Sequence, residues 1–220
     1  MPNIFDNITD GTRLGAALQE SLQQFDTVDV ATGYLDLRGW SSFAEVIESK
    51  RTPGELSDEP RARVLVGMVA PSDSQEILNS LQEAVQPAPY GSDIHDYGKA
   101  LARRDQLVRH LRNQLMRGLA TKTGQTTLRT LKSQLEDGAV QMKVFTEKPL
   151  HGKTYIFHKP GMQFGSTGAY VGSSNLTGAG LYRNLELNID APVVGDDLCG
   201  RATLAWLCQP NPDPGELPGK

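Results

Sequence analysis

The sequence has only two cysteines in 220 residues, and no apolar run long enough to cross a bilayer. Cys199 and Cys208 lie nine positions apart on one expected helix. A rise of 1.5 Å per residue puts their α-carbons about 13 Å apart, too far for a disulfide, so we interpret them as reduced core residues. The first residues lack the basic and apolar pattern of a signal peptide. We therefore expect a cytoplasmic protein with no membrane partner.

An overall excess of basic charge is also absent, since the net charge is −4. The charge is unevenly distributed, however. Residues 99–159 contain thirteen Lys and Arg against four Asp and Glu, a net charge of +9, and the rest of the chain carries −13. A basic segment of this kind is what a polyanion such as nucleic acid would need, and it is equally what a solvated helical face would show.

Apolar periodicity predicts helices alternating with strands. The expected helices are 11–24, 41–49, 71–85, 92–119, 126–136 and 196–207, and the expected strands are 26–33, 63–69, 140–146, 151–157, 169–172 and 185–190. Several strands are apolar on both faces, which is typical of a covered sheet. We predict an α/β fold in which a mixed β-sheet is sandwiched between helices. One domain would span 1–208, followed by a proline-rich tail or linker at 209–220.

Histidine is scarce, with four residues, and only His151 has a lysine two positions later. On a strand, His151 and Lys153 would leave the same face. An imidazole beside an ammonium is a workable nucleophile for a phosphate ester, because the ammonium gathers the anionic oxygens while a ring nitrogen attacks phosphorus. These two residues are therefore the first catalytic candidates.

Two later segments add polar groups suited to the same chemistry. In Gly172-Ser173-Ser174-Asn175, the Ser173 hydroxyl and the Asn175 amide could bind phosphoryl oxygens, although such a stretch alone is more often a turn. Glu186 is a third catalytic candidate, because a carboxylate can hold an imidazole in one tautomer. Tyr34 and Asn188 are candidates for a substrate pocket. The alternatives are a core aromatic for Tyr34, as we favour for Trp40, and an amide that only satisfies backbone groups for Asn188.

At these residues the chain resembles the phospholipase D superfamily, whose signature is H-x-K-x4-D followed by G-S-x-N. The matching residues are His151, Lys153, Gly172, Ser173 and Asn175, whereas His158 stands at the acidic position. The resemblance spans roughly residues 3–208. The sequence around Gly33-Tyr34-Leu35 and Gly172 is similar to that of phospholipase D-like nuclease modules of bacterial helicases and restriction systems.

This resemblance implies a metal-independent phosphodiesterase that needs no cofactor and forms a phosphohistidine. The mechanism uses two histidines, one to attack phosphorus and one to protonate the leaving oxygen. Because the chain has one motif, and His158 should lie on the opposite strand face from His151, we expect a homodimer with paired copies of His151. Nucleic acid, DNA rather than RNA, is the expected substrate, and a helicase domain or subunit is a candidate partner.

Two other interpretations stay open. One is a phospholipid phosphodiesterase or transferase, which the lack of a basic amphipathic helix with bulky apolar residues disfavours. The other is a DNA-binding or dimerisation module without turnover, motivated by His158 at the position of the family's acid.

Overall fold

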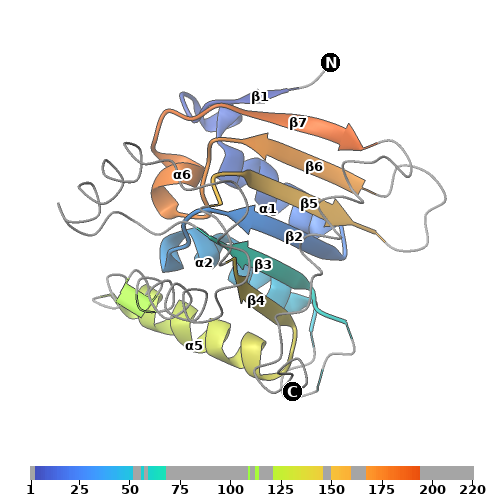
Figure 1. The fold of residues 1–220 in the computed structure, drawn as a ribbon, viewed down its shortest axis with the longest axis vertical. Coiled ribbons are helices and arrows are strands. Elements are labelled where there is room, and N and C mark those ends of the chain that lie inside the picture. The colour runs from blue at the N-terminus through green and yellow to red at the C-terminus, as the bar shows by residue number, and fades with distance from the viewer. Residues whose placement is uncertain are drawn as a thin grey trace, which may run out of the picture.

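A single seven-stranded sheet organises the computed structural model, which describes residues 3–51, 56, 59–67, 109, 112–113, 121–145, 150–159 and 167–193 (Figure 1). The strands are β1 (Ile4–Phe5), β2 (Thr27–Thr32), β3 (Ala62–Val66), β4 (Val140–Val144), β5 (Lys153–His158), β6 (Thr167–Gly172) and β7 (Asn188–Val193). Their order in space is β1-β7-β6-β5-β2-β3-β4. Strands β2, β3 and β4 are parallel, and all other pairs are antiparallel. The prediction of a mixed α/β sheet is therefore confirmed.

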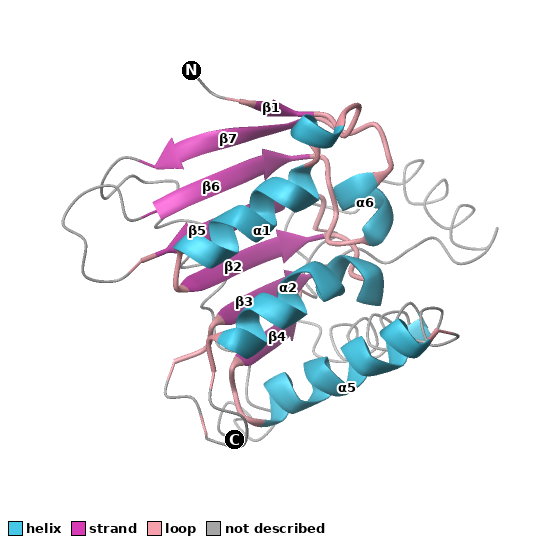
Figure 2. Cartoon of the chain, turned by 180° about the vertical axis from the view of Figure 1, so that it is seen from behind, coloured by secondary structure: helices cyan, strands magenta, loops and turns pink. Residues whose placement is uncertain are grey.

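The described helices lie together on one face of this sheet (Figure 2). They are α1 (Leu14–Gln24), α2 (Leu37–Ser49), α5 (Lys122–Glu136) and α6 (Gly178–Tyr182), with a 3-10 turn at Asp10–Thr12. Helix α5 packs against α2, and α1 packs against α2 and α6. The described residues thus show one helical layer of the expected sandwich. The longest of these helices has 15 residues, and no helix in this part of the chain is long and apolar enough to cross a membrane.

Most of the described elements coincide with those expected from periodicity, and the differences have local causes. Helix α2 begins at Leu37, earlier than expected, because the Asp36 carboxylate caps it by accepting a hydrogen bond from the Gly39 amide at 2.7 Å. The strand expected at 185–190 begins only at Asn188, because its partner β6 ends at Gly172. The short elements β1 and α6 carry too few residues for a periodic signal.

Several expectations lie outside the described residues. These are the helix at 71–85, the helix at 196–207 with Cys199 and the adjacent Cys208, the tail at 209–220, and most of the basic segment. Within the helix expected at 92–119, residues 109, 112 and 113 are described, and they are helical and exposed.

The core fills the space between the sheet and the helices. Val28 and Val30 of β2 alternate inward, and beside them Tyr155 and Phe157 of β5 meet the helical layer. Trp40 of α2 is 0% exposed and stacks on Phe43, with ring centroids 5.9 Å apart, which confirms its interpretation as a core aromatic. This packing fixes α2 against the carboxyl end of β2.

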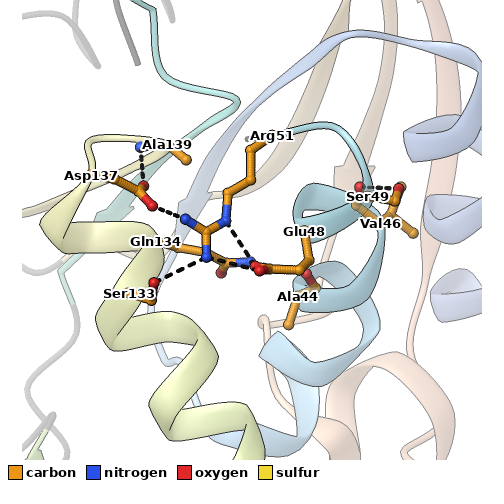
Figure 3. Close-up of polar contacts among 9 residues, drawn as sticks. All are labelled: Ala44, Val46, Glu48, Ser49, Arg51, Ser133, Gln134, Asp137 and Ala139. Atoms are coloured by element: carbon orange, nitrogen blue, oxygen red, sulfur yellow. Dashed lines mark hydrogen bonds and ion pairs between the residues drawn. The ribbon is translucent and has the colours of Figure 1, made fainter. Parts of the chain in front are cut away.

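A buried charge cluster joins the end of α2 to the end of α5 (Figure 3). The Arg51 guanidinium donates to Glu48 from Nε at 2.8 Å and to Ser133 at 3.1 Å, and it forms an ion pair with Asp137. The Asp137 carboxylate also accepts from the Ala139 amide at 3.1 Å. The Arg51 side chain is only 5% exposed, so the cluster is largely shielded from water.

We expect Arg51→Met to lower the free energy of unfolding by about 3–5 kcal/mol, because it leaves the buried Asp137 carboxylate without its counter-charge. The matched control is Arg13→Met, since Arg13 pairs with Asp10 at 2.8 Å on the surface, with side chains 44% and 90% exposed. The control should change stability by no more than about 0.5 kcal/mol. Urea denaturation of both variants measures the difference, and equal losses would contradict the prediction.

Candidate active site

The predicted site residues gather where the ends of four neighbouring strands meet. Strands β2 and β6 end there, and β5 and β7 begin there. The register places Lys153 opposite Gly172, and Gly172 opposite Asn188. The motif segments therefore come together because the strands carrying them are neighbours in alternating directions.

His151 lies just before β5, exposed to solvent, and its ring contacts Lys153. The Lys153 Nζ is 3.0 Å from the His151 Nδ1 and donates to the His151 carbonyl oxygen at 2.7 Å. A protonated lysine can only donate, so Nδ1 acts as the acceptor and the neutral ring carries its proton on Nε2. In this arrangement, attack through Nε2 requires Nζ to release Nδ1.

Lys153 is a buried cation, only 6% exposed. Burial lowers the pKa of Lys153 below its ordinary value of 10.5, and the negative charge of Glu186 opposes this shift. The structure thus confines an ammonium beside the imidazole, with a carboxylate within electrostatic range. A phosphoryl group entering here would add negative charge beside the buried ammonium.

Glu186 is hydrogen-bonded to Ser173. Its Oε2 accepts from the Ser173 hydroxyl at 2.5 Å, and the same hydroxyl accepts from the Leu187 amide at 2.9 Å. No hydrogen bond joins Glu186 to His151 among the described residues. The predicted role of Glu186 in holding an imidazole therefore stays a prediction, as does phosphate binding by Ser173.

Asn175 is held by the turn that follows β2. Its Oδ1 accepts from the Gly33 amide at 3.1 Å and from the Tyr34 amide at 3.0 Å. Both hydrogen bonds engage the Asn175 Oδ1 with backbone amides of the protein. The NH2 group is therefore the part of the side chain that could donate to a phosphoryl oxygen.

The two pocket candidates differ in environment. Tyr34 is half-buried beside Asn175, and burial raises the pKa of its phenol. Asn188 is 1% exposed, and its amide bonds the Ser174 amide, the Ser174 hydroxyl and the Phe5 carbonyl oxygen. These contacts match the alternative in which Asn188 satisfies groups of its own chain.

Sequence reasoning missed two residues that support the site. The buried Tyr155 hydroxyl donates to the Ser174 carbonyl oxygen at 2.9 Å, and the buried Thr32 hydroxyl accepts from the Leu176 amide at 3.0 Å. Both tie the Gly-Ser-Ser-Asn turn to neighbouring strands. A signal existed for Tyr155, which follows Lys153 by two positions and so shares its strand face.

His158, at the position of the family's acid, lies at the other end of β5. Its Nε2 is 3.0 Å from the Asp29 carboxylate, and Arg63 binds the same carboxylate through two contacts of 2.6 Å. Asp29 is 1% exposed. The Asp29 carboxylate of β2 is therefore bound by both His158 and Arg63, away from His151.

Gly172 has no room for a side chain, because a Cβ would overlap the Leu187 carbonyl oxygen and the Asn188 amide oxygen. We expect Gly172→Ala to lower the free energy of unfolding by about 1–3 kcal/mol through overpacking. Gly152→Ala is the matched control, because its Cβ would meet only the Leu150 Cδ1 at 3.8 Å. Thermal denaturation should separate the two, and a stable Gly172→Ala protein would disprove the close approach.

Within the described part of the chain, no group of three or more His, Cys, Asp and Glu is placed to hold a metal ion.

His151, Lys153 and the Gly-Ser-Ser-Asn turn thus lie together at one end of the strands, as the resemblance to the phospholipase D superfamily implies. In a comparison with protein families, residues 115–192, roughly a third of the chain, match the model described as the NgoFVII restriction endonuclease N-terminal PLD domain. The matched segment contains every motif residue from His151 to Asn188 and excludes Tyr34. A search of the curated proteins found no match.

Proposed function

We propose that this protein is a metal-independent nuclease that cleaves DNA through a phosphohistidine, in a restriction or defence system. The match to the PLD domain of a restriction endonuclease supports the nuclease and its context. The observation that carries the chemistry is the buried Lys153 ammonium held 3.0 Å from the His151 ring. A role on DNA inside the cell places the protein in the cytoplasm.

In the proposed reaction, Lys153 and the Asn175 NH2 group bind the non-bridging phosphoryl oxygens. Lys153 turns from Nδ1 of His151 to a phosphoryl oxygen, and the ring proton moves from Nε2 to Nδ1 through solvent. The Nε2 of His151 then bonds to phosphorus while the bond to the leaving oxygen breaks, and the protonated His151 of a second copy gives that oxygen a proton. Water then attacks phosphorus, the P–N bond breaks, and the second histidine takes the proton of the water. Lysine and amide donors supply the charge stabilisation that other nucleases obtain from metal ions.

The second copy is proposed because, among the described residues, one histidine lies at the site. Of the two described histidines, His158 is bonded to Asp29 at the far end of β5. We therefore propose a symmetric homodimer whose two His151 rings face each other across the axis. Fusion to, or association with, a helicase is a further proposal that rests on the resemblance alone.

Plasmid cleavage in EDTA tests the nuclease, and subunit mixing tests the shared site. We expect cleavage to persist in chelator. When wild-type and His151→Ala chains are co-expressed in equal amounts, about a quarter of random dimers retain both histidines, so total activity should follow the square of the wild-type fraction. Activity that follows the fraction linearly, or a sedimentation mass of one chain, would refute the shared site.

The module without turnover is the second candidate, because position 158 departs from the family motif. It predicts salt-sensitive DNA binding with no cutting by either the wild type or His151→Ala. The Lys153 ammonium 3.0 Å from the His151 ring favours the nuclease over this candidate, since the two motif residues lie together.

A further inference from the structure

Thr32 is the last residue of β2, and it lies beside the site without belonging to the motif. Its neighbour Ala31 pairs with Thr154, which puts Thr32 next to Lys153 across the β2–β5 pair. Thr32 is 0% exposed, so its hydroxyl must find its hydrogen bonds inside the protein.

The Thr32 hydroxyl bridges two turns that enclose the Asn175 amide. It accepts from the Leu176 amide at 3.0 Å, in the turn after β6, and donates to the Tyr34 carbonyl oxygen at 2.9 Å, in the turn after β2. The Thr32 Oγ1 is also 3.4 Å from the Asn175 Oδ1. One hydroxyl thus holds both backbone segments that determine where the Asn175 side chain lies.

The same two turns determine which way the Asn175 amide faces. Its Oδ1 accepts from the amides of Gly33 and Tyr34, and a flipped amide would point NH2 donors at these two N–H groups. The flip is therefore excluded while the two turns keep their spacing, and the NH2 group stays oriented as a donor. Such preorganised donors stabilise charge without reorganising during reaction.

We propose that Thr32 is a positioning residue for phosphoryl transfer, acting through Asn175 and not through the substrate. This inference rests on the proposed function, because it assigns Thr32 to the phosphate-binding part of that site. The hydroxyl keeps the turns after β2 and β6 at the spacing that aligns the Asn175 NH2 group with a phosphoryl oxygen beside Lys153.

Four variants test this role. Thr32→Val removes the hydroxyl at nearly constant shape, and Thr32→Ser keeps it. Thr127→Val is the matched control, since Thr127 is a buried threonine of α5, at 7% exposure. Asn175→Ala provides the background in which a residue acting through Asn175 has nothing left to position.

The measurement is kcat for plasmid cleavage in EDTA, per folded molecule. We expect Thr32→Val to lower kcat about tenfold and Thr32→Ser and Thr127→Val to stay within about twofold, since small misplacements of a binding group carry large rate losses. In the Asn175→Ala background, Thr32→Val should change kcat by less than about twofold. An equal loss in both backgrounds, or lower thermal stability with unchanged kcat, would overturn the proposal.

If the wild type does not cleave in EDTA, the proposed nuclease fails, and calorimetric binding of tungstate, a phosphate analogue, replaces kcat. If Thr32→Val weakens tungstate binding in the wild-type background and causes no further weakening in the Asn175→Ala background, the positioning role is supported independently of turnover. Failure of the wild type to bind tungstate, or equal binding by Thr32→Val, overturns it.

Discussion

His151→Ala is expected to abolish plasmid cleavage in EDTA, lowering kcat by about 10⁴-fold or more, as loss of a covalent nucleophile does. His151 is exposed and its ring contacts Lys153, so its removal should leave the fold intact. His158→Ala on the same strand should keep cleavage within about twofold, because its ring contacts Asp29 and no group at the site.

The two histidine variants should also differ in stability: His158→Ala, which keeps cleavage, should be the less stable of the two. Loss of the His158 ring removes one partner of the buried Asp29 carboxylate, with an expected loss of about 1–3 kcal/mol in the free energy of unfolding. Thermal denaturation and plasmid cleavage of both proteins give the comparison. DNA cleavage by His151→Ala above that of a preparation made without the protein would contradict the phosphohistidine mechanism.

Lys153→Met is expected to lower kcat about 10²- to 10³-fold, as removal of a transition-state charge partner typically does. The ammonium is the buried cation beside the proposed nucleophile, and methionine keeps the apolar length of the side chain without its charge. Lys153→Arg tests geometry, because a planar guanidinium cannot reproduce the contacts of Nζ with both the Nδ1 and the carbonyl oxygen of His151. Single-turnover kinetics at saturating DNA measures both variants.

The same substitution should raise stability at neutral pH. Because burial lowers the pKa of Lys153 in the folded state, the unfolded chain holds this proton more tightly, and the charged form opposes folding. This penalty is fully present below the folded pKa and disappears as the pH rises through the folded pKa toward the unfolded value near 10.5. Lys153→Met should therefore be more stable than wild type at pH 7, with the difference shrinking in alkali. A less stable variant would contradict the direction of the shift.

The contact between Lys153 and His151 also describes the free enzyme before substrate arrives. Since the ammonium donates to Nδ1, a neutral ring holds its proton on Nε2, the tautomer that cannot attack phosphorus through Nε2. In the proposed reaction, a phosphoryl oxygen that draws Nζ away leaves Nδ1 open to a proton, while Nε2 gives its own proton to solvent. Substrate binding would thus produce the tautomer that attacks, whereas the proton donor would be the protonated imidazole of the proposed second copy.

Local sequence was sufficient for much of the sheet and of the site. The apolar runs of β2, β3 and β5 predicted strands, and His151 and Lys153 were identified from their spacing alone. Position 36 shows the limit: the helix was expected to begin at residue 41, yet Asp36 caps α2, which begins at Leu37. Gly39 is required within this helix because the backbone of Leu176, far along the chain, approaches too closely for any side chain.

The sequence by itself determined the alternation of helices and strands and the residue types of the candidate site, because both are short-range patterns along one segment. Only the tertiary structure decided which partners these residues have. Glu186 bonds Ser173, Asp29 supplies the carboxylate beside His158, and Thr32 holds the turns around Asn175. Such contacts join strands whose neighbours are set by sheet order and register, and Thr32 and Leu176 are 144 positions apart. Spacing along the chain carries no information about pairs of this kind.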